Sequence, residues 1–218
     1  MERSFVVTGA GGGVGRALVD RLVADGGVVA LDLDEPALAW IATHPAAARI
    51  VAVCGDATDE SVTEEAADRA ESLAPLAGWV NNAAVFRDAA LHTSPAGMVL
   101  EIITANLALT LVGCATAVRR LLAAGHGGAI VNVSSHQGQR PVRGAMPYAT
   151  AKGAVESLTR ALAVDHGPDG ILGERRRARL DQHGAVRVTS RRPRARRREP
   201  DRSGDGPAAP PRPGRPTG

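Results

Sequence analysis

The chain has 218 residues, of which 44% are hydrophobic and only 2% aromatic, and its formal net charge is +3. This length predicts a single domain, and because no uninterrupted apolar run reaches roughly eighteen residues, no membrane span is expected. The two cysteines, Cys54 and Cys114, lack metal-ligand spacing. We therefore expect buried, reduced thiols, no metal and a cytoplasmic protein.

The first expected strand, residues 4–8, leads directly into a glycine-rich loop. The loop reads Thr8-Gly9-Ala10-Gly11-Gly12-Gly13-Val14-Gly15, and a helix with one apolar face is expected at 14–25. Glycines between a strand and a helix let the backbone approach a pyrophosphate, and the helix N-terminus offers free N–H groups and a favourable dipole. A merely flexible loop is the alternative, but this position favours a bound dinucleotide.

The second expected strand, residues 27–32, ends at Asp32, about twenty residues beyond the glycines. An acidic residue there accepts hydrogen bonds from an adenosine ribose and repels a 2′-phosphate. Its alternative role is to cap a helix expected at 35–43, although Asp34 could cap that helix equally well. No basic residue stands in the loop before Gly13. The sequence therefore predicts NAD in preference to NADP.

The rest of the chain continues the alternation of strands and helices. Such a pattern predicts right-handed crossovers and a doubly wound α/β fold of the Rossmann type, with a parallel sheet in the order 3-2-1-4-5. A ligand then binds at the carboxyl ends of the strands, near the switch point. Further strands are expected at 49–54, 78–81 and 128–134, and further helices at 59–73, 98–123 and 147–166.

The only tyrosine and the only lysine of the chain, Tyr148 and Lys152, stand four residues apart in the last expected helix. Residues at this spacing lie on one helical face. An ammonium group near a phenol favours the phenolate, so we expect a lowered Tyr148 pKa and a group able to exchange protons. A surface pair is the alternative reading of these two residues alone.

Together these features resemble the short-chain dehydrogenase/reductase family, over about Glu2 to Ile171. Its motifs occur here in the family's order: the glycine loop, Asp56-Ala57, Asn81-Asn82-Ala83-Ala84, Ser135, and Tyr148 with Lys152. Ala84 stands where the family usually has glycine, and an added methyl group there should be tolerated. Asn106, in the long expected helix, matches a fourth catalytic position of the family.

The resemblance implies an enzyme that transfers a hydride between NAD(H) and a small alcohol or carbonyl substrate. Tyr148 would be the general acid/base, Lys152 would hold the nicotinamide ribose, and Ser135 would bind the substrate oxygen. Asn106 would hold a water that connects Lys152 to solvent. The cofactor-binding residues expected are Thr8, Gly9, Gly13, Val14, Gly15, Asp32, Asp56, Ala57, Asn82, Ala83, Tyr148 and Lys152.

Some of these residues also have simpler readings. Without the other motifs, Asp56 would be a turn residue and Ser135 a strand-end hydroxyl. The spacing to Tyr148 selects Ser135 as the functional serine and leaves Ser134 structural. His136 follows Ser135 where a substrate could pass, although a solvated loop histidine is the simpler interpretation.

The C-terminal part differs in composition. Residues 1–170 contain twelve Lys and Arg against eighteen Asp and Glu, whereas residues 171–218 contain fourteen arginines, five acids, seven prolines and no aromatic residue. Such a segment buries too little apolar surface to offset its ordering entropy, so we expect residues 172–218 to be disordered. A basic tail can bind nucleic acid. This tail lacks interleaved aromatic residues and a recognisable fold, so no nucleic-acid partner is expected.

A frameshift explains this change better. Glu174 to His183 can be encoded as GAA CGC CGT CGC GCC CGG CTG GAT CAA CAC, which without its first base reads Asn-Ala-Val-Ala-Pro-Gly-Trp-Ile-Asn-Thr. That string resembles the family's segment just after the start of its sixth strand. We therefore expect a frame change near Leu172–Gly173, an incomplete cofactor-binding domain at 1–171, and an uncovered edge at residues 129–135.

That interpretation has two consequences. The missing part would include the family's sixth and seventh strands and its substrate-capping helices, so the identity of the substrate is not encoded in this chain. An inactive remnant that still binds NAD is the alternative to an active enzyme. The family typically forms homo-oligomers, which the altered C-terminus makes doubtful here.

Overall fold

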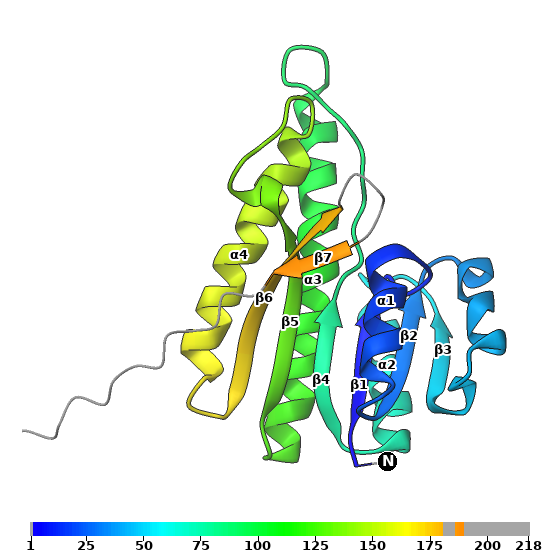
Figure 1. The fold of residues 1–218 in the computed structure, drawn as a ribbon. Coiled ribbons are helices and arrows are strands. Elements are labelled where there is room, and N and C mark those ends of the chain that lie inside the picture. The colour runs from blue at the N-terminus through cyan, green and yellow to red at the C-terminus, as the bar shows by residue number, and fades with distance from the viewer. Residues whose placement is uncertain (1, 181–185, 190–218) are drawn as a thin grey trace, which may run out of the picture.

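The computed structural model describes the backbone of residues 2–180 and 186–189, and the side chains of residues 2–174. The chain forms one seven-stranded sheet in the order β3-β2-β1-β4-β5-β6-β7 (Figure 1). Neighbouring strands from β3 through β6 are parallel, and β7 is antiparallel to β6. The Rossmann-type α/β fold and the predicted strand order are confirmed. The strands are β1 (Ser4–Thr8), β2 (Gly27–Asp32), β3 (Ile50–Cys54), β4 (Leu76–Asn81), β5 (Gly128–Ser135), β6 (Ile171–Leu180) and β7 (Val186–Thr189).

The helices lie close to their expected positions. Residues 35–43 are helical as expected, but they form a 3₁₀ helix, η1, rather than an α-helix. The α-helices are α1 (Gly13–Leu22), α2 (Glu60–Leu73), α3 (Ala96–Ala124) and α4 (Met146–His166), and the other short 3₁₀ helices are η2 (Ala47–Arg49) and η3 (His136–Gly138).

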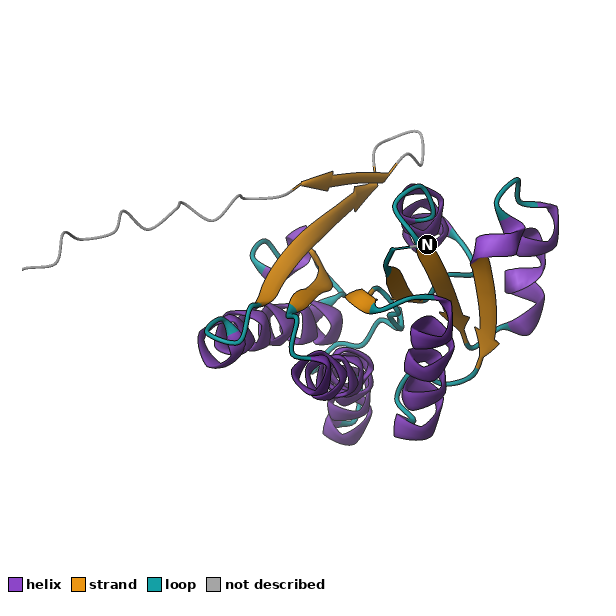
Figure 2. Ribbon diagram, turned by 90° about the horizontal axis from the view of Figure 1, so that it is seen from below, coloured by secondary structure: helices purple, strands orange, loops and turns teal. Residues whose placement is uncertain are grey.

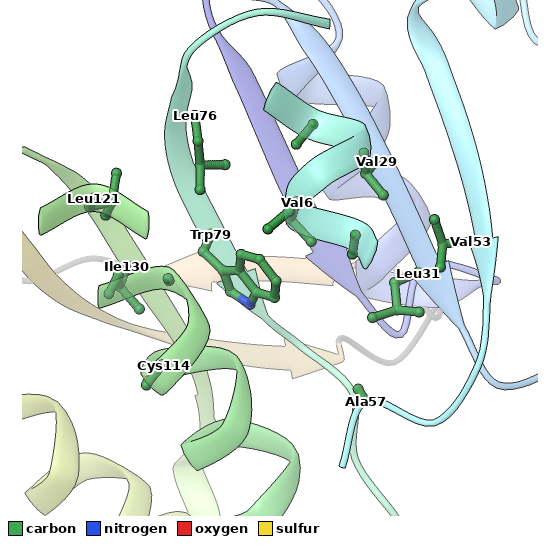
Figure 3. Close-up of a cluster of buried hydrophobic side chains, with 14 of the residues drawn as sticks. Val6, Val29, Leu31, Val53, Ala57, Leu76, Trp79, Cys114, Leu121 and Ile130 are labelled. Carbon is green, nitrogen blue, oxygen red and sulfur yellow. The ribbon is translucent and has the colours of Figure 1, made fainter. Parts of the chain in front are cut away.

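Helices cover both faces of the sheet, as Figure 2 shows. Alternate residues of each strand point to opposite faces, so Val6 and Phe5 of β1 belong to two different apolar clusters. The first cluster packs the sheet against α2, α3 and α4, with Trp79 fully buried at its centre (Figure 3). The second packs the other face against α1 and η1. Because strands β1 to β6 are parallel, their carboxyl ends all lie at one edge of this sheet.

Helix α3 is long and apolar enough to cross a membrane by length and composition. The sequence expectation of no such segment counted only uninterrupted apolar runs, whereas α3 includes polar residues such as Asn106 and Thr110 within its apolar stretch. Leu109, Ala117 and Leu121 on one face of α3 pack into the core against the sheet. In this fold α3 is packed as a core helix.

The expectation that residues 172–218 are disordered is wrong for two segments, which form β6 and β7. Strand β6 pairs with the whole of β5, from Gly128 opposite Ile171 to Ser135 opposite Ala178, so this edge of β5 is not uncovered. Ile171 is fully buried and anchors β6 in the core. The tail's prolines begin only at Pro193, so β6 and β7 precede any residue that removes a backbone donor. Residues 181–185 and 190–218, also expected to be disordered, lie outside the described residues.

The two cysteines have different environments. Cys114 of α3 is buried as expected, and burial raises the pKa of its thiol to about 11. Cys54 is exposed, contrary to the expectation, because its side chain at the end of β3 lies on the outer edge of the sheet. Both thiols are free.

Candidate active site

A cavity of about 1370 Å³ opens at the carboxyl ends of the strands. It is lined by the segments that follow β1, β2, β3, β4 and β5, together with residues of α3 and α4. Single drug-sized ligands occupy pockets of roughly 300–1,000 Å³. The cavity therefore has room for a large ligand with a smaller one beside it, at the edge that the sequence predicts.

The conformation of the glycine loop depends on residues without a side chain. Gly9 and Gly13 have positive φ angles of 66° and 52°, which favour glycine. A Cβ on Gly15 would overlap the Gly9 carbonyl oxygen, so α1 begins in direct contact with the end of β1. Gly12 and Gly13 face open space instead. Gly12 is the N-cap of α1 and gives no side-chain hydrogen bond, which leaves the first N–H groups of the helix without a side-chain cap.

Thr8 and Asn82 join this loop to the segment after β4. The Thr8 hydroxyl accepts hydrogen bonds from the backbone N–H groups of Asn82 and Ala83, both at 3.1 Å. The Asn82 amide donates to the carbonyls of Thr8 at 3.1 Å and Gly9 at 2.9 Å. Both amide hydrogens of Asn82 thus hold the turn. Asn82 and Ala83 line the cavity, whereas Thr8 and Gly15, also expected to bind the cofactor, do not.

The acidic residues at the strand ends are partly engaged with nearby backbone. Asp32 accepts a hydrogen bond from the Gly11 N–H at 2.7 Å and another from the Asp34 N–H at 3.1 Å. Asp56 accepts from the Thr58 N–H at 2.8 Å, as a turn residue does. A carboxylate has about four acceptor positions, so both side chains keep capacity for a ligand, and both line the cavity.

Ser135, Tyr148 and Lys152 meet at the other end of the cavity. Ser135 ends β5, and Tyr148 and Lys152 lie one turn apart on the face of α4 that packs against the sheet. All three are buried, with Lys152 only 2% exposed. The Lys152 ammonium lies 5.5 Å from the centre of the Tyr148 ring and donates to the Val133 carbonyl at 2.9 Å. The buried pair rules out the alternative of a surface contact.

The electrostatics of this pair differ from the expectation. Burial raises the pKa of Tyr148, and a hydrogen bond with Ser135 counters this only in part. Burial also lowers the pKa of Lys152 to about 8. The expected lowering of the Tyr148 pKa by Lys152 is therefore wrong for the cofactor-free chain, because loss of hydration dominates both groups. In this state Tyr148 is a neutral phenol and thus a proton donor.

Asn106 is fully buried in α3 and does not line the cavity. Its amide donates to the carbonyls of Val85 and Ile102, and its oxygen accepts from the Val85 N–H, each at 3.0 Å. Both donors are therefore used, and only a lone pair of the oxygen remains for the water that the resemblance implies. The visible role of Asn106 is to fix the backbone of Val85.

Comparisons with known proteins agree with this arrangement. The family model described as short chain dehydrogenase matches residues 3–172. The chain belongs to the short-chain dehydrogenase family. It is 34% identical over 179 residues to the 2-(R)-hydroxypropyl-CoM dehydrogenase of Xanthobacter autotrophicus, covering 78% of this chain and 71% of that protein. It is 34% identical over 171 residues to the L-xylulose reductase of Bos taurus, covering 78% of this chain and 68% of that one.

A solved structure of a short-chain dehydrogenase/reductase family oxidoreductase from Burkholderia thailandensis superposes with a TM-score of 0.70 at 31% identity, covering 80% of this chain and 68% of that one. The relatives of this short-chain dehydrogenase are named dehydrogenases and reductases, which supports an oxidoreductase that uses a nicotinamide cofactor. These names agree on the reaction class but not on a substrate.

Sequence reasoning missed part of the cavity wall. Ser134, expected to be structural, donates to the Lys152 carbonyl at 3.3 Å and to the Glu156 carboxylate at 3.4 Å. His136 was not missed: it is exposed, and it lines the cavity where the sequence analysis allowed a substrate to pass. Phe86 and Leu100 also line it, although no motif contains either residue. The sequence offered one signal for Phe86: it follows the motif Asn81-Asn82-Ala83-Ala84, with only Val85 between them.

Proposed function

We propose that this chain is an NAD-dependent oxidoreductase that interconverts a small alcohol and its carbonyl compound, with Tyr148 as the general acid/base. One observation carries the proposal: Ser135, Tyr148 and Lys152 line the same cavity as the glycine loop and Asp32. A dinucleotide bound along this cavity brings its nicotinamide and a substrate oxygen to the same end. NAD supplies the hydride acceptor or donor, and the protein supplies position and electrostatics.

The residues of the cofactor end fit such a ligand. The uncapped N-terminus of α1 and the open space above Gly12 and Gly13 suit a pyrophosphate. Gly9, Val14, Asp56, Ala57, Asn82 and Ala83 all line the cavity. Asp56 and Ala57 would meet the adenine, and Asn82 with Ala83 would line the ribose side.

NAD is preferred to NADP in this proposal because of the charges around Asp32. Lys152 is the only lysine or arginine among the described cavity-lining side chains, and it lies at the catalytic end, as does His136. Arg16 is close in sequence, but its guanidinium lies over the Trp40 ring, 4.9 Å from its centre. A 2′-phosphate would therefore face the Asp32 carboxylate without a compensating cation.

At the catalytic end, the Ser135 hydroxyl would hydrogen-bond the substrate oxygen. The Tyr148 phenol would give that oxygen a proton during reduction and take it back during oxidation. Lys152 would turn from Val133 toward the cofactor ribose and the phenol when the cofactor binds, and a water near Asn106 would connect it to solvent. Burial holds these groups away from bulk water, so each proton moves between defined atoms.

The test is NADH oxidation with a panel of ketones and aldehydes. The wild-type chain should turn over at least one of them, and Tyr148→Phe should lose turnover while keeping NADH affinity. Tyr148→Phe with wild-type turnover would remove Tyr148 from the mechanism.

A second candidate is a cofactor-binding remnant without turnover. It is favoured by one observation: the family match ends at residue 172, beside the position where the frame change is inferred. Residues 1–171 would then bind NADH while residues 172–218 fail to complete the substrate site. NADH binding without turnover, together with activity in a version shifted by one base after codon 173, would support this candidate. Robust turnover by the unmodified chain would exclude it.

A further inference from the structure

An aromatic ring lines the catalytic end of the cavity beside Tyr148. The rings of Phe86 and Tyr148 have centres 4.8 Å apart and planes inclined by 35°. Phe86 is nevertheless 75% exposed, and Leu100, which lines the same cavity, is 62% exposed. One large apolar side chain therefore stands exposed against the ring of the proposed proton donor, and a second lines the same cavity.

The backbone on both sides of Phe86 is tied down. Val85 is held by the Asn106 amide through both its N–H and its carbonyl. Arg87 donates to Glu101 at 2.9 Å, which links the loop to α3 directly beside Leu100. The position of the ring is therefore set by contacts on three consecutive residues and not by its own burial.

The charges at this end argue against an anionic substrate. Arg87 is paired with Glu101, and Lys152 is buried and donates to Val133. Lys152 is the only lysine or arginine among the described residues of the wall, which also includes His136 and the carboxylate of Glu101. A carboxylate or phosphate on the substrate would lose hydration here and face the Glu101 carboxylate without a free lysine or arginine to pair with.

We infer that Phe86 and Leu100 form an apolar subsite, and that the substrate is an uncharged ketone, or the matching secondary alcohol, that carries an aryl or branched alkyl group. This inference rests on the proposed function. The group packs against Phe86 and Leu100 while the oxygen meets Ser135 and Tyr148. In reduction, a hydride moves from NADH to the carbonyl carbon and the phenol proton moves to the oxygen, which gives NAD⁺, the alcohol and a phenolate that is reprotonated from solvent.

The experiment measures ketone binding to the full chain at saturating NAD⁺ by calorimetry, because a ketone cannot react with the oxidised cofactor, and hydride transfer from NADH is measured in parallel. Acetophenone represents the aryl ketones, hydroxyacetone the small polar ketones, and 4-acetylbenzoate carries the same ring with a carboxylate. The wild-type chain should bind acetophenone at least about tenfold more tightly than either of the others.

Phe86→Ala and Leu100→Ala should each weaken acetophenone binding, by about tenfold for Phe86, and leave hydroxyacetone and NADH affinities within about twofold. Leu111→Ala is the matched control, because Leu111 is a similarly exposed leucine of α3 that does not line the cavity. Phe86→Leu should fall between wild type and Phe86→Ala.

The outcomes separate the two proposals. Absence of NADH binding to the wild-type chain would overturn the proposed function. Normal NADH binding with no preference for acetophenone, or with an equal loss in the Leu111 control, would overturn the apolar subsite alone.

Discussion

The two ends of the cavity are built in different ways. At the cofactor end the wall is backbone: a Cβ on Gly15 would overlap the Gly9 carbonyl, and Asn82 uses both amide hydrogens to hold that turn. At the substrate end the wall includes two exposed apolar side chains, Phe86 and Leu100. Backbone geometry tolerates little change, whereas side chains at an open rim can be exchanged at little cost in stability. In the proposed function, backbone geometry would therefore hold the cofactor, and side chains at the open end of the cavity would select the substrate.

The largest effect is expected where the two ends meet. Tyr148→Phe keeps the ring that contacts Phe86 and removes the oxygen that exchanges the proton. Turnover should fall by about 10²–10⁴-fold, with NADH affinity largely unchanged. Steady-state rates together with an NADH titration check this. A variant that also lost NADH binding would show that Tyr148 supports the cofactor end as well.

Burial of Lys152 predicts a pH-dependent stability. Its pKa is lowered from 10.5 in the unfolded chain to about 8 in the folded chain. Between pH 8 and 10.5 Lys152 is protonated in the unfolded chain and neutral in the folded chain. The free energy of unfolding should therefore rise with pH, by about 3 kcal/mol across this range.

Denaturant unfolding of the cofactor-free chain from pH 8 to 10 measures this effect, with Lys152→Met as the control. The difference in unfolding free energy between wild type and Lys152→Met should grow in favour of wild type as the pH rises. A constant difference would mean that Lys152 is hydrated and charged throughout.

Two glycine-to-alanine substitutions test whether close backbone contacts form the cofactor end of the cavity. Gly15→Ala forces a methyl group against the Gly9 carbonyl and should lower the free energy of unfolding by about 2 kcal/mol, with loss of NADH binding. Gly12→Ala is the matched control, since Gly12 has an extended backbone with φ of −163° and nothing near its Cβ position. Chemical denaturation should place this control within about 0.5 kcal/mol of wild type. Equal effects of the two alanines would contradict the account.

The smallest effect on stability and substrate binding is expected from the ion pair beside Phe86 and Leu100. The Arg87–Glu101 pair is half exposed on both sides, and such pairs contribute only about 0–1 kcal/mol. Glu101→Gln should therefore leave thermal stability almost unchanged and weaken acetophenone binding by less than about threefold. In wild type that contribution should shrink at high salt. A large loss of stability would mean that the ion pair, rather than the Asn106 contact, holds the loop.

The sequence predicted β1 and β2 to the residue, because short apolar runs end there at glycines and acids. Helical spacing put Tyr148 and Lys152 on one face, the family resemblance added Ser135, and the structure brings all three to one cavity. The sequence analysis missed β6, since an arginine-rich composition says little about a proline-free segment beside the open edge of β5. The pKa of Tyr148 and the place of Phe86 were out of reach, because burial and loop contacts depend on the whole fold.

The most direct test of the account is an isothermal titration of the unmodified 218-residue chain with NADH and with NADPH. The account predicts saturable binding of one NADH per chain, at least about tenfold tighter than NADPH, a difference of roughly 1.4 kcal/mol. Asp32→Ser should reduce that ratio by improving NADPH binding. Failure of the folded chain to bind either nucleotide would contradict the account, and equal affinities would show that Asp32 does not read the ribose.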